Sequence, residues 1–257
     1  MAVLNLVDTR LRYERIAGDE VRPTLVFLHE GLGCIDMWRG FPARLCAALG
    51  CPGLLYDRVG YGGSSPLVRP RTIGYLHEAA LQELPAVLEQ LLPGADYVLI
   101  GHSDGGSIAL LHAAARPARL RAIVTEAAHV FVEPVTLDGI RAAVEAYAAG
   151  KLRGLAKYHG DKTDTIFSAW ADTWLGDGFR AWNIERGLES IVCPALVMQG
   201  VDDQYGTAAQ VESIVSRVPN ARAELVPECG HSPHQEQADV VLELMRAFLA
   251  PLLEPAP

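Results

Sequence analysis

Short apolar runs alternate with longer amphipathic stretches along most of this chain. The apolar runs predict buried strands at 25–28, 54–56, 98–100, 120–125, 196–198 and 223–226. An imperfect alternation at 3–7 and 11–16 predicts an opening hairpin. Helical periodicity is found at 38–49, 73–92, 107–115, 208–218 and 239–249. Strands that alternate with helices predict an α/β fold with a mostly parallel eight-stranded sheet and helices on both faces.

The interval 131–190 breaks this alternation. It has no convincing strand pattern, and it has helical pieces at about 138–149 and 165–175. Phe167, Trp170 and Trp174 are spaced i, i+3 and i+7, so they share one helical face. We therefore expect a core formed by 1–130 and 191–257, with a helical insertion at 131–190. The rings either seal the insertion onto the core, which is the commoner use of such residues, or line an apolar pocket.

A tight turn is predicted where the run 97–100 meets Gly-His-Ser-Asp-Gly-Gly at 101–106. Gly-x-Ser-x-Gly between a strand and a helix is typical of a nucleophile elbow, in which strain exposes the serine hydroxyl above the sheet. Glycines flank Ser103 because side chains there would collide with neighbouring backbone. A serine hydroxyl needs a base, and the base needs an acid that orients it. Ser103 is thus a candidate nucleophile.

Partners for Ser103 follow later in the chain. A buried-type strand ends in Gly-Val-Asp-Asp at 200–203, and another apolar stretch ends in Gly-His at 230–231. The order Ser103, Asp203, His231 resembles the catalytic triad of the α/β-hydrolase superfamily, over about residues 25–249. The resemblance implies Ser103 as nucleophile, His231 as general base and Asp203 as acid. It favours Asp203 over Asp202, because the acid usually stands three residues after the glycine that ends its strand.

Two further loops are similar to loops of this family. His-Glu-Gly-Leu-Gly at 29–33 resembles the oxyanion loop, which implies backbone donors at Gly31 and at Asp104. The family usually has His-Gly where this chain has His29 and Glu30, so the donor is assigned to within one residue. We interpret His29 as a ring that ties loops together. Asp-Arg-Val-Gly-Tyr-Gly at 57–62 resembles the family's loop after the fourth strand, and we interpret it as a structural loop whose Asp57 and Arg58 fix the loops beside the site.

Other residues are expected near the pocket. Glu126 ends the strand 120–125, and some family members carry their acid after this strand, so it competes with Asp203. Glu30, Glu126, His129, Trp170 and Trp174 are candidate pocket residues, although His129 is more typical of a hydrogen-bonded hinge. His231 and His234 are three apart, but no third ligand has suitable spacing, so we expect no metal and no cofactor.

Composition narrows the possible partners. The formal net charge of −9 argues against nucleic acid and anionic membranes, and no apolar run is long enough to span a bilayer. The first eight residues are too short and polar for a leader, and five cysteines without Cys-x-x-Cys favour free thiols in a reducing cytoplasm. A small-molecule substrate is expected, and a homodimer is compatible with the sequence.

The resemblance implies a serine hydrolase with a helical lid at 131–190. The leading substrate class is a small carboxylic ester or lactone, cleaved through an acyl-enzyme. Hydrolysis of a carbon–carbon bond in ring-fission products is an alternative in the same fold. A receptor that retains a triad and turns its ligand over slowly is an alternative from another class.

Overall fold

The computed structural model describes residues 2–253, and they form one eight-stranded sheet with the order β1-β2-β4-β3-β5-β6-β7-β8. The strands are β1 (Ala2–Asn5), β2 (Arg10–Ile16), β3 (Thr24–Leu28), β4 (Gly53–Tyr56), β5 (Tyr97–His102), β6 (Leu120–Glu126), β7 (Ala195–Gly200) and β8 (Ala221–Val226). Strand β2 runs antiparallel to β1 and β4, and all other pairs are parallel. The predicted mostly parallel sheet is confirmed.

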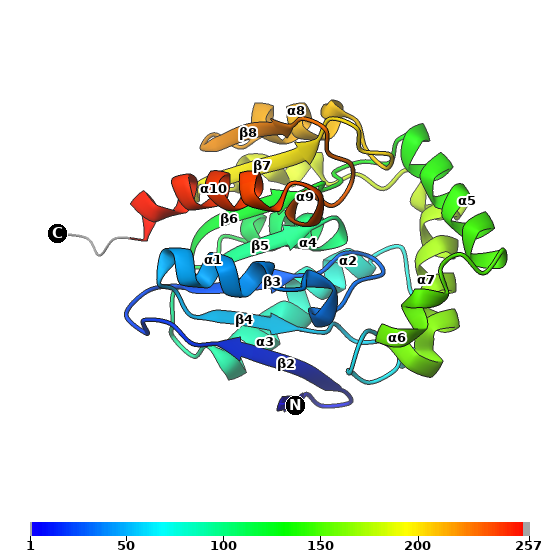
Figure 1. Cartoon of the computed structure of the whole chain (residues 1–257), viewed down its shortest axis with the longest axis horizontal. Coiled ribbons are helices and arrows are strands. Elements are labelled where there is room, and N and C mark those ends of the chain that lie inside the picture. Colours follow the sequence, from blue (N-terminus) through cyan, green and yellow to red (C-terminus); the bar gives the residue numbers. More distant parts are fainter. Residues whose placement is uncertain (1, 254–257) are drawn as a thin grey trace.

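Helices cover both faces of the sheet (Figure 1). Residues of α1 (Phe41–Leu49) and α10 (Ala238–Leu249) belong to one apolar cluster, and residues of α3 (Leu84–Leu91), α4 (Asp104–Ala114) and α8 (Ala208–Arg217) belong to the other. Strand β3 is buried along its whole length, with Leu25 and Phe27 in the first cluster and Val26 and Leu28 in the second. This double burial explains why the strand is a continuous apolar run.

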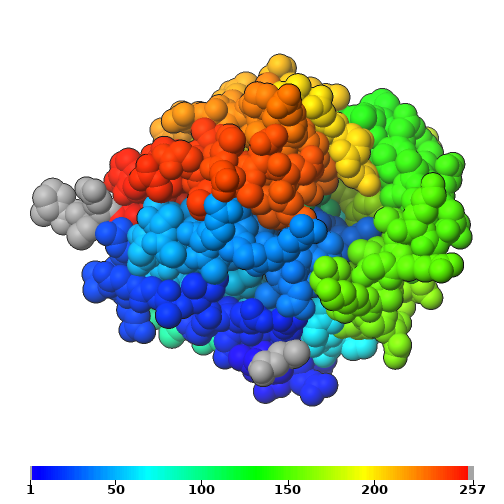
Figure 2. All heavy atoms as spheres, in the orientation of Figure 1, coloured from blue at the N-terminus to red at the C-terminus, as the bar shows by residue number. Residues whose placement is uncertain are grey.

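The interval 131–190 contains helical turns and no strand, as its sequence predicts. Its longer helices are α5 (Pro134–Ala148) and α7 (Thr163–Leu175), and its shorter ones are η3 (Arg153–Leu155), α6 (Ala156–His159), η4 (Gly160–Lys162), η5 (Asp177–Phe179) and η6 (Glu185–Ser190). An isolated bridge between Phe131 and Asn183 ties its two ends together. Helices α5 to α7 stand together at one end of the sheet, and they form the outer surface there (Figures 1 and 2).

Two predicted helices differ in their details. The helix expected at 38–49 is a 3-10 turn, η1 (Ile35–Trp38), followed by α1, with Gly40 as its N-cap. The helix expected at 73–92 consists of α2 (Tyr75–Glu78), a π-turn, η2 (Ala79–Glu83), and α3. Pro85 has no N–H and would crowd the preceding turn of a regular helix, which the wider π-turn accommodates.

The remaining short elements are α9 (Pro233–Glu236) and η7 (Ala250–Leu252). None of the helices within 2–253 combines the length and apolar character that crossing a bilayer requires.

Candidate active site

Ser103 occupies a strained turn between β5 and α4. Its φ of 53° and ψ of −117° lie outside the regions that non-glycine residues usually adopt. A Cβ on Gly101 would lie 2.2 Å from the Gly105 carbonyl oxygen, and one on Gly105 would lie 2.0 Å from that of Leu28. Both glycines are therefore required by close backbone approach. The side chain of Ser103 thus starts at the carboxyl end of the sheet and at the N-terminus of a helix.

His231 lies between Ser103 and Asp203. Its Nε2 is 3.0 Å from Ser103 Oγ, and its Nδ1 is 2.8 Å from Asp203 Oδ1. The backbone N–H of Tyr205 also donates to Asp203 Oδ1, at 2.8 Å. Burial opposes ionisation of Asp203, but the facing His231 and the Tyr205 N–H keep its pKa below the ordinary value. An ionised Asp203 fixes the proton of the neutral ring on Nδ1, so Nε2 can accept a proton from Ser103.

Two backbone N–H groups border Ser103. Those of Gly31 and Asp104 make no hydrogen bond within residues 2–253 outside regular helix and strand pairing, and the amides of a first helical turn are free to bind an anion. A Cβ on Gly31 would lie 2.6 Å from Trp170 Nε1, so the indole stands directly against this glycine.

A pocket of about 110 Å³ contains Ser103 and His231. Its walls come from the loop after β3, the elbow, α5, α7 and the loops after β6, β7 and β8. Its lining residues are Glu30, Gly31, Leu32, Ser103, Asp104, His129, Thr136, Ile140, Trp170, Trp174, Tyr205 and His231. The structure brings six of the residues that the sequence analysis singled out to this pocket beside Ser103 and His231: Glu30, Gly31, Asp104, His129, Trp170 and Trp174.

Glu126 is placed differently from the expectation. It is fully buried and does not line the pocket, and its Oε2 accepts a hydrogen bond from the backbone N–H of His234 at 2.8 Å, with His234 Nδ1 at 3.1 Å. Glu126 pairs in register with His102 of β5, so both side chains point to the face that α1 covers. His231 therefore has Asp203, not Glu126, as its carboxylate partner.

Four pocket residues were missed by sequence reasoning. Thr136 and Ile140 lie on α5, and Leu32 and Tyr205 lie on loops. Tyr205 could have been found from its position two residues after Asp203. Leu32 could have been found from its position directly after Gly31. Thr136 and Ile140 gave no signal, because their approach to Ser103 depends on how the insertion packs.

His29 and Asp57 hold the loops after β3 and β4 together, which is the structural role that the sequence analysis gave them. His29 Nε2 accepts the backbone N–H of Arg58 at 3.1 Å, and Arg58 donates to the carbonyls of His29 and Glu30. Asp57 accepts the N–H groups of Ile35 and Gly63, both at 2.7 Å. These buried contacts fix the loop after β3 relative to the loop after β4.

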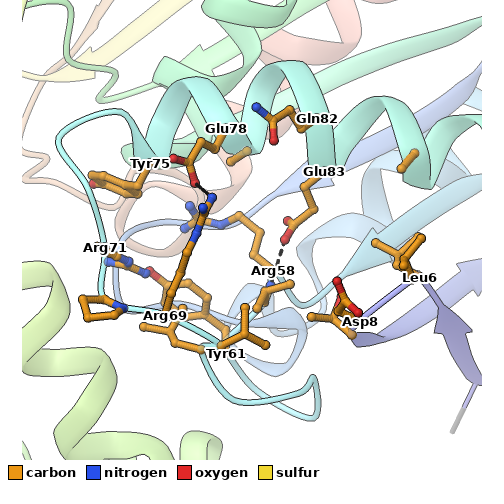
Figure 3. Close-up of a pocket in the computed structure, with 18 residues that line it drawn as sticks. Leu6, Asp8, Arg58, Tyr61, Arg69, Arg71, Tyr75, Glu78, Gln82 and Glu83 are labelled. Carbon is orange, nitrogen blue, oxygen red and sulfur yellow. Dashed lines mark hydrogen bonds and ion pairs between the residues drawn. The ribbon is translucent and has the colours of Figure 1, made fainter.

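A second, larger groove of about 700 Å³ lies beside the site (Figure 3). The Arg71 guanidinium stacks there over the rings of Tyr61 and Tyr75, at 5.1 and 4.7 Å. Tyr75 also reaches the elbow, because its hydroxyl donates to Asp104 Oδ2 at 2.9 Å and accepts from Trp174 Nε1 at 2.9 Å. The groove contains no member of the Ser103–His231–Asp203 group.

Comparison with known proteins agrees with this arrangement. The model of the alpha/beta hydrolase family matches residues 25–244. The human serine hydrolase BPHL is 28% identical over 204 residues, which cover 76% of this chain and 68% of that protein. A 2-hydroxy-6-oxononadienedioate/2-hydroxy-6-oxononatrienedioate hydrolase of Dechloromonas aromatica is 25% identical, with 95% and 91% of the two chains covered. The crystal structure of VinJ superposes with a TM-score of 0.75 at 25% identity, covering 98% of each chain.

Proposed function

Because this chain belongs to the alpha/beta hydrolase family, we propose that it is a serine hydrolase that cleaves a small carboxylic ester or lactone. One observation carries the proposal: His231 lies 3.0 Å from Ser103 Oγ through one ring nitrogen and 2.8 Å from Asp203 through the other. A serine placed in this way is an activated nucleophile. The residue order in the chain and the strained turn at Ser103 support the same reading.

In this mechanism Ser103 Oγ bonds to the substrate carbonyl carbon, and its proton moves to His231 Nε2. The carbonyl oxygen becomes an oxyanion, which the N–H groups of Gly31 and Asp104 bind; one such donor contributes about 2.7–4 kcal/mol to lowering a barrier. The bond to the leaving group then breaks as His231 returns the proton to it. Water attacks the acyl-enzyme by the same route, which releases the acid and restores Ser103.

We further propose that the segment 131–190 is a lid and that 1–130 with 191–257 is the catalytic core. Trp170 and Trp174 of α7 line the pocket with Ser103, so the segment encloses the reacting groups. In this role the two rings bound the space that the acyl group can occupy.

A carbon–carbon bond hydrolase is the second candidate. The Dechloromonas relative, whose name gives 2-hydroxy-6-oxo-dienedioate and -trienedioate substrates, matches over 95% of this chain. The same serine and histidine suit that chemistry, so substrate assays must separate the two. A slow receptor would instead show one turnover with tight retention of product.

The test uses a fluorophosphonate probe and a panel of p-nitrophenyl esters, lactones and a ring-fission dienoate. We expect one label, at Ser103, and repeated turnover of an ester or lactone. Ser103→Ala should lose the label and about 10⁶ in kcat while its circular dichroism is unchanged. Labelling at another serine, or full activity of the variant, contradicts the proposal.

A further inference from the structure

Strand β8 lies at one edge of the sheet, and no other strand within residues 2–253 pairs with its outer side (Figure 1). The residues Arg222, Ala223 and Leu225 of this strand are exposed, so the neighbouring helices cover little of it. An edge of this kind presents unpaired N–H and C=O groups, which are a template for pairing with another strand.

The main-chain groups of β8 that point outward can be identified from its hydrogen bonds. The carbonyls of Asn220 and Val226 accept N–H groups on the β7 side, at 3.0 and 2.9 Å. Alternate residues of a strand direct their main-chain groups to opposite sides, so the even-numbered residues of β8 face β7. Ala223 and Leu225 therefore direct their N–H and C=O groups away from the sheet.

The two charged side chains of β8 are placed symmetrically about Ala223. Arg222 precedes this residue and Glu224 follows it, and Arg222 Nε donates to Glu224 Oε1 at 2.8 Å. Strand alternation puts both charges on one face and Ala221, Ala223 and Leu225 on the other. Leu225 is 46% exposed. One face of this edge is thus ionic, and the other is apolar.

This pattern is complementary to itself in one arrangement. When two copies of β8 run antiparallel about a two-fold axis at Ala223, Arg222 of each copy lies opposite Glu224 of the other. The two copies of Ala223 then exchange N–H···O=C bonds, and the N–H of Leu225 meets the carbonyl of Ala221. Opposite charges directly across an antiparallel pair stabilise it, whereas like charges destabilise it. Both the main chain and the charges therefore fit a second copy of the same strand.

We propose that two copies of this chain associate through β8, antiparallel about Ala223, so that their two sheets become one. The opposite edge strand, β1, contains no charged residue, so it has no comparable pattern that would select a partner or a register. No residue of β8 lines the pocket of Ser103, so the contact is independent of the proposed hydrolase function.

Sedimentation velocity at a series of protein concentrations measures this association, with circular dichroism as the folding check. We expect the wild-type protein to be a reversible dimer. Arg222→Glu gives the strand two negative charges and Glu224→Arg gives it two positive charges, so either change should raise the dimer Kd about tenfold or more. An equimolar mixture of the two variants should dimerise again, because opposite charges then face each other across the axis. Arg141→Glu, at an exposed position of α5, is the matched control and should leave the Kd unchanged.

A cysteine at the proposed axis tests the register. The Cα atoms of a hydrogen-bonded antiparallel pair are about 5.5 Å apart, which is a separation that a disulfide spans. Ala223→Cys should therefore form a covalent dimer under mild oxidation, seen on a non-reducing gel. Ala142→Cys, at an exposed position of α5, is the matched control and should stay monomeric, since the five native cysteines are buried.

A wild-type protein that is monomeric at every concentration would overturn the inference. A dimer that both charge variants leave intact would also overturn it, because association would then use another surface, such as β1. Charge variants that stay monomeric when they are mixed would contradict the antiparallel arrangement. If a charge variant does not fold, the cross-link of Ala223→Cys against that of Ala142→Cys decides, and equal cross-linking of the two counts against the proposal.

Discussion

His102 is 2.7 Å, through its Nε2, from the backbone carbonyl oxygen of His231. His102 directly precedes Ser103, so the hydrogen bond connects the candidate nucleophile's strand to the backbone of the candidate base, His231. His102 is 1% exposed and is surrounded by Glu30, Glu126, His231 and His234. Burial would lower the pKa of His102, but Glu30, Glu126 and the His231 carbonyl raise it to about 9. A buried cation thus lies beneath the base.

The charge of His102 should make stability depend on pH. Its pKa is about 6.5 when unfolded and about 9 when folded, so its stabilising effect is complete below about 6.5 and is lost as the pH rises through 9. His102→Gln should flatten the fall of the unfolding free energy between pH 7 and 9, by at most about 1.4 kcal/mol per pH unit. Urea unfolding at several pH values measures this. Parallel curves for both proteins would show that His102 is not charged in the folded state.

The acid of the proposed triad can be assigned by two variants. Asp203→Asn should lower kcat by about 10⁴, because the hydrogen-bonded partner of His231 then no longer favours the reactive tautomer. Glu126→Gln should cost about tenfold or less, since Glu126 contacts His234 and not His231. Both are assayed at one pH, with circular dichroism as the folding check. A severe Glu126 effect beside a mild Asp203 effect would reverse the assignment.

The tryptophans of α7 should set acyl-chain preference. Trp170→Ala enlarges the pocket, so relative kcat/KM should move toward longer acyl chains by about 1–3 kcal/mol. Trp182→Ala is the matched control: Trp182 stacks on Phe179 at 5.2 Å and does not line the pocket. It should lower the melting temperature without changing the order of substrates. An equal loss on every ester in Trp170→Ala would mean that this ring only packs.

The elbow glycines should tolerate no side chain. Gly105→Ala places a methyl group 2.0 Å from the Leu28 carbonyl oxygen, so β3 and α4 must separate. We expect a loss of about 3 kcal/mol or more in unfolding free energy, seen as a lower melting temperature. Gly154→Ala meets nothing within 4 Å and should leave that temperature nearly unchanged. Equal melting temperatures for the two variants would contradict the close approach.

Residue patterns predict the sheet and the helical stretch 131–190, because each depends on local spacing. The resemblance to the α/β-hydrolase superfamily predicts Asp203 and His231 as partners of Ser103, because all three residues follow the ends of parallel strands. Glu126 shows what such patterns omit: its position at a strand end is correct, but strand alternation turns its side chain away from the pocket. The approach of Ile140 and Thr136 to Ser103 depends on long-range packing of α5. No local signal encodes that packing.

The hydrogen bonds from Trp174 to Tyr75 and from Tyr75 to Asp104 join three distant stretches of the chain in one line. One end belongs to the insertion, the middle to α2 and the other end to the elbow. Replacing the insertion by that of a relative would therefore also change contacts of α2 and of the elbow. A donor segment without an indole at position 174 would leave the Tyr75 hydroxyl one partner short, and the alignment of the elbow would change with it. Chimaeras of this family should accordingly be designed with Trp174, Tyr75 and Asp104 inherited as a set.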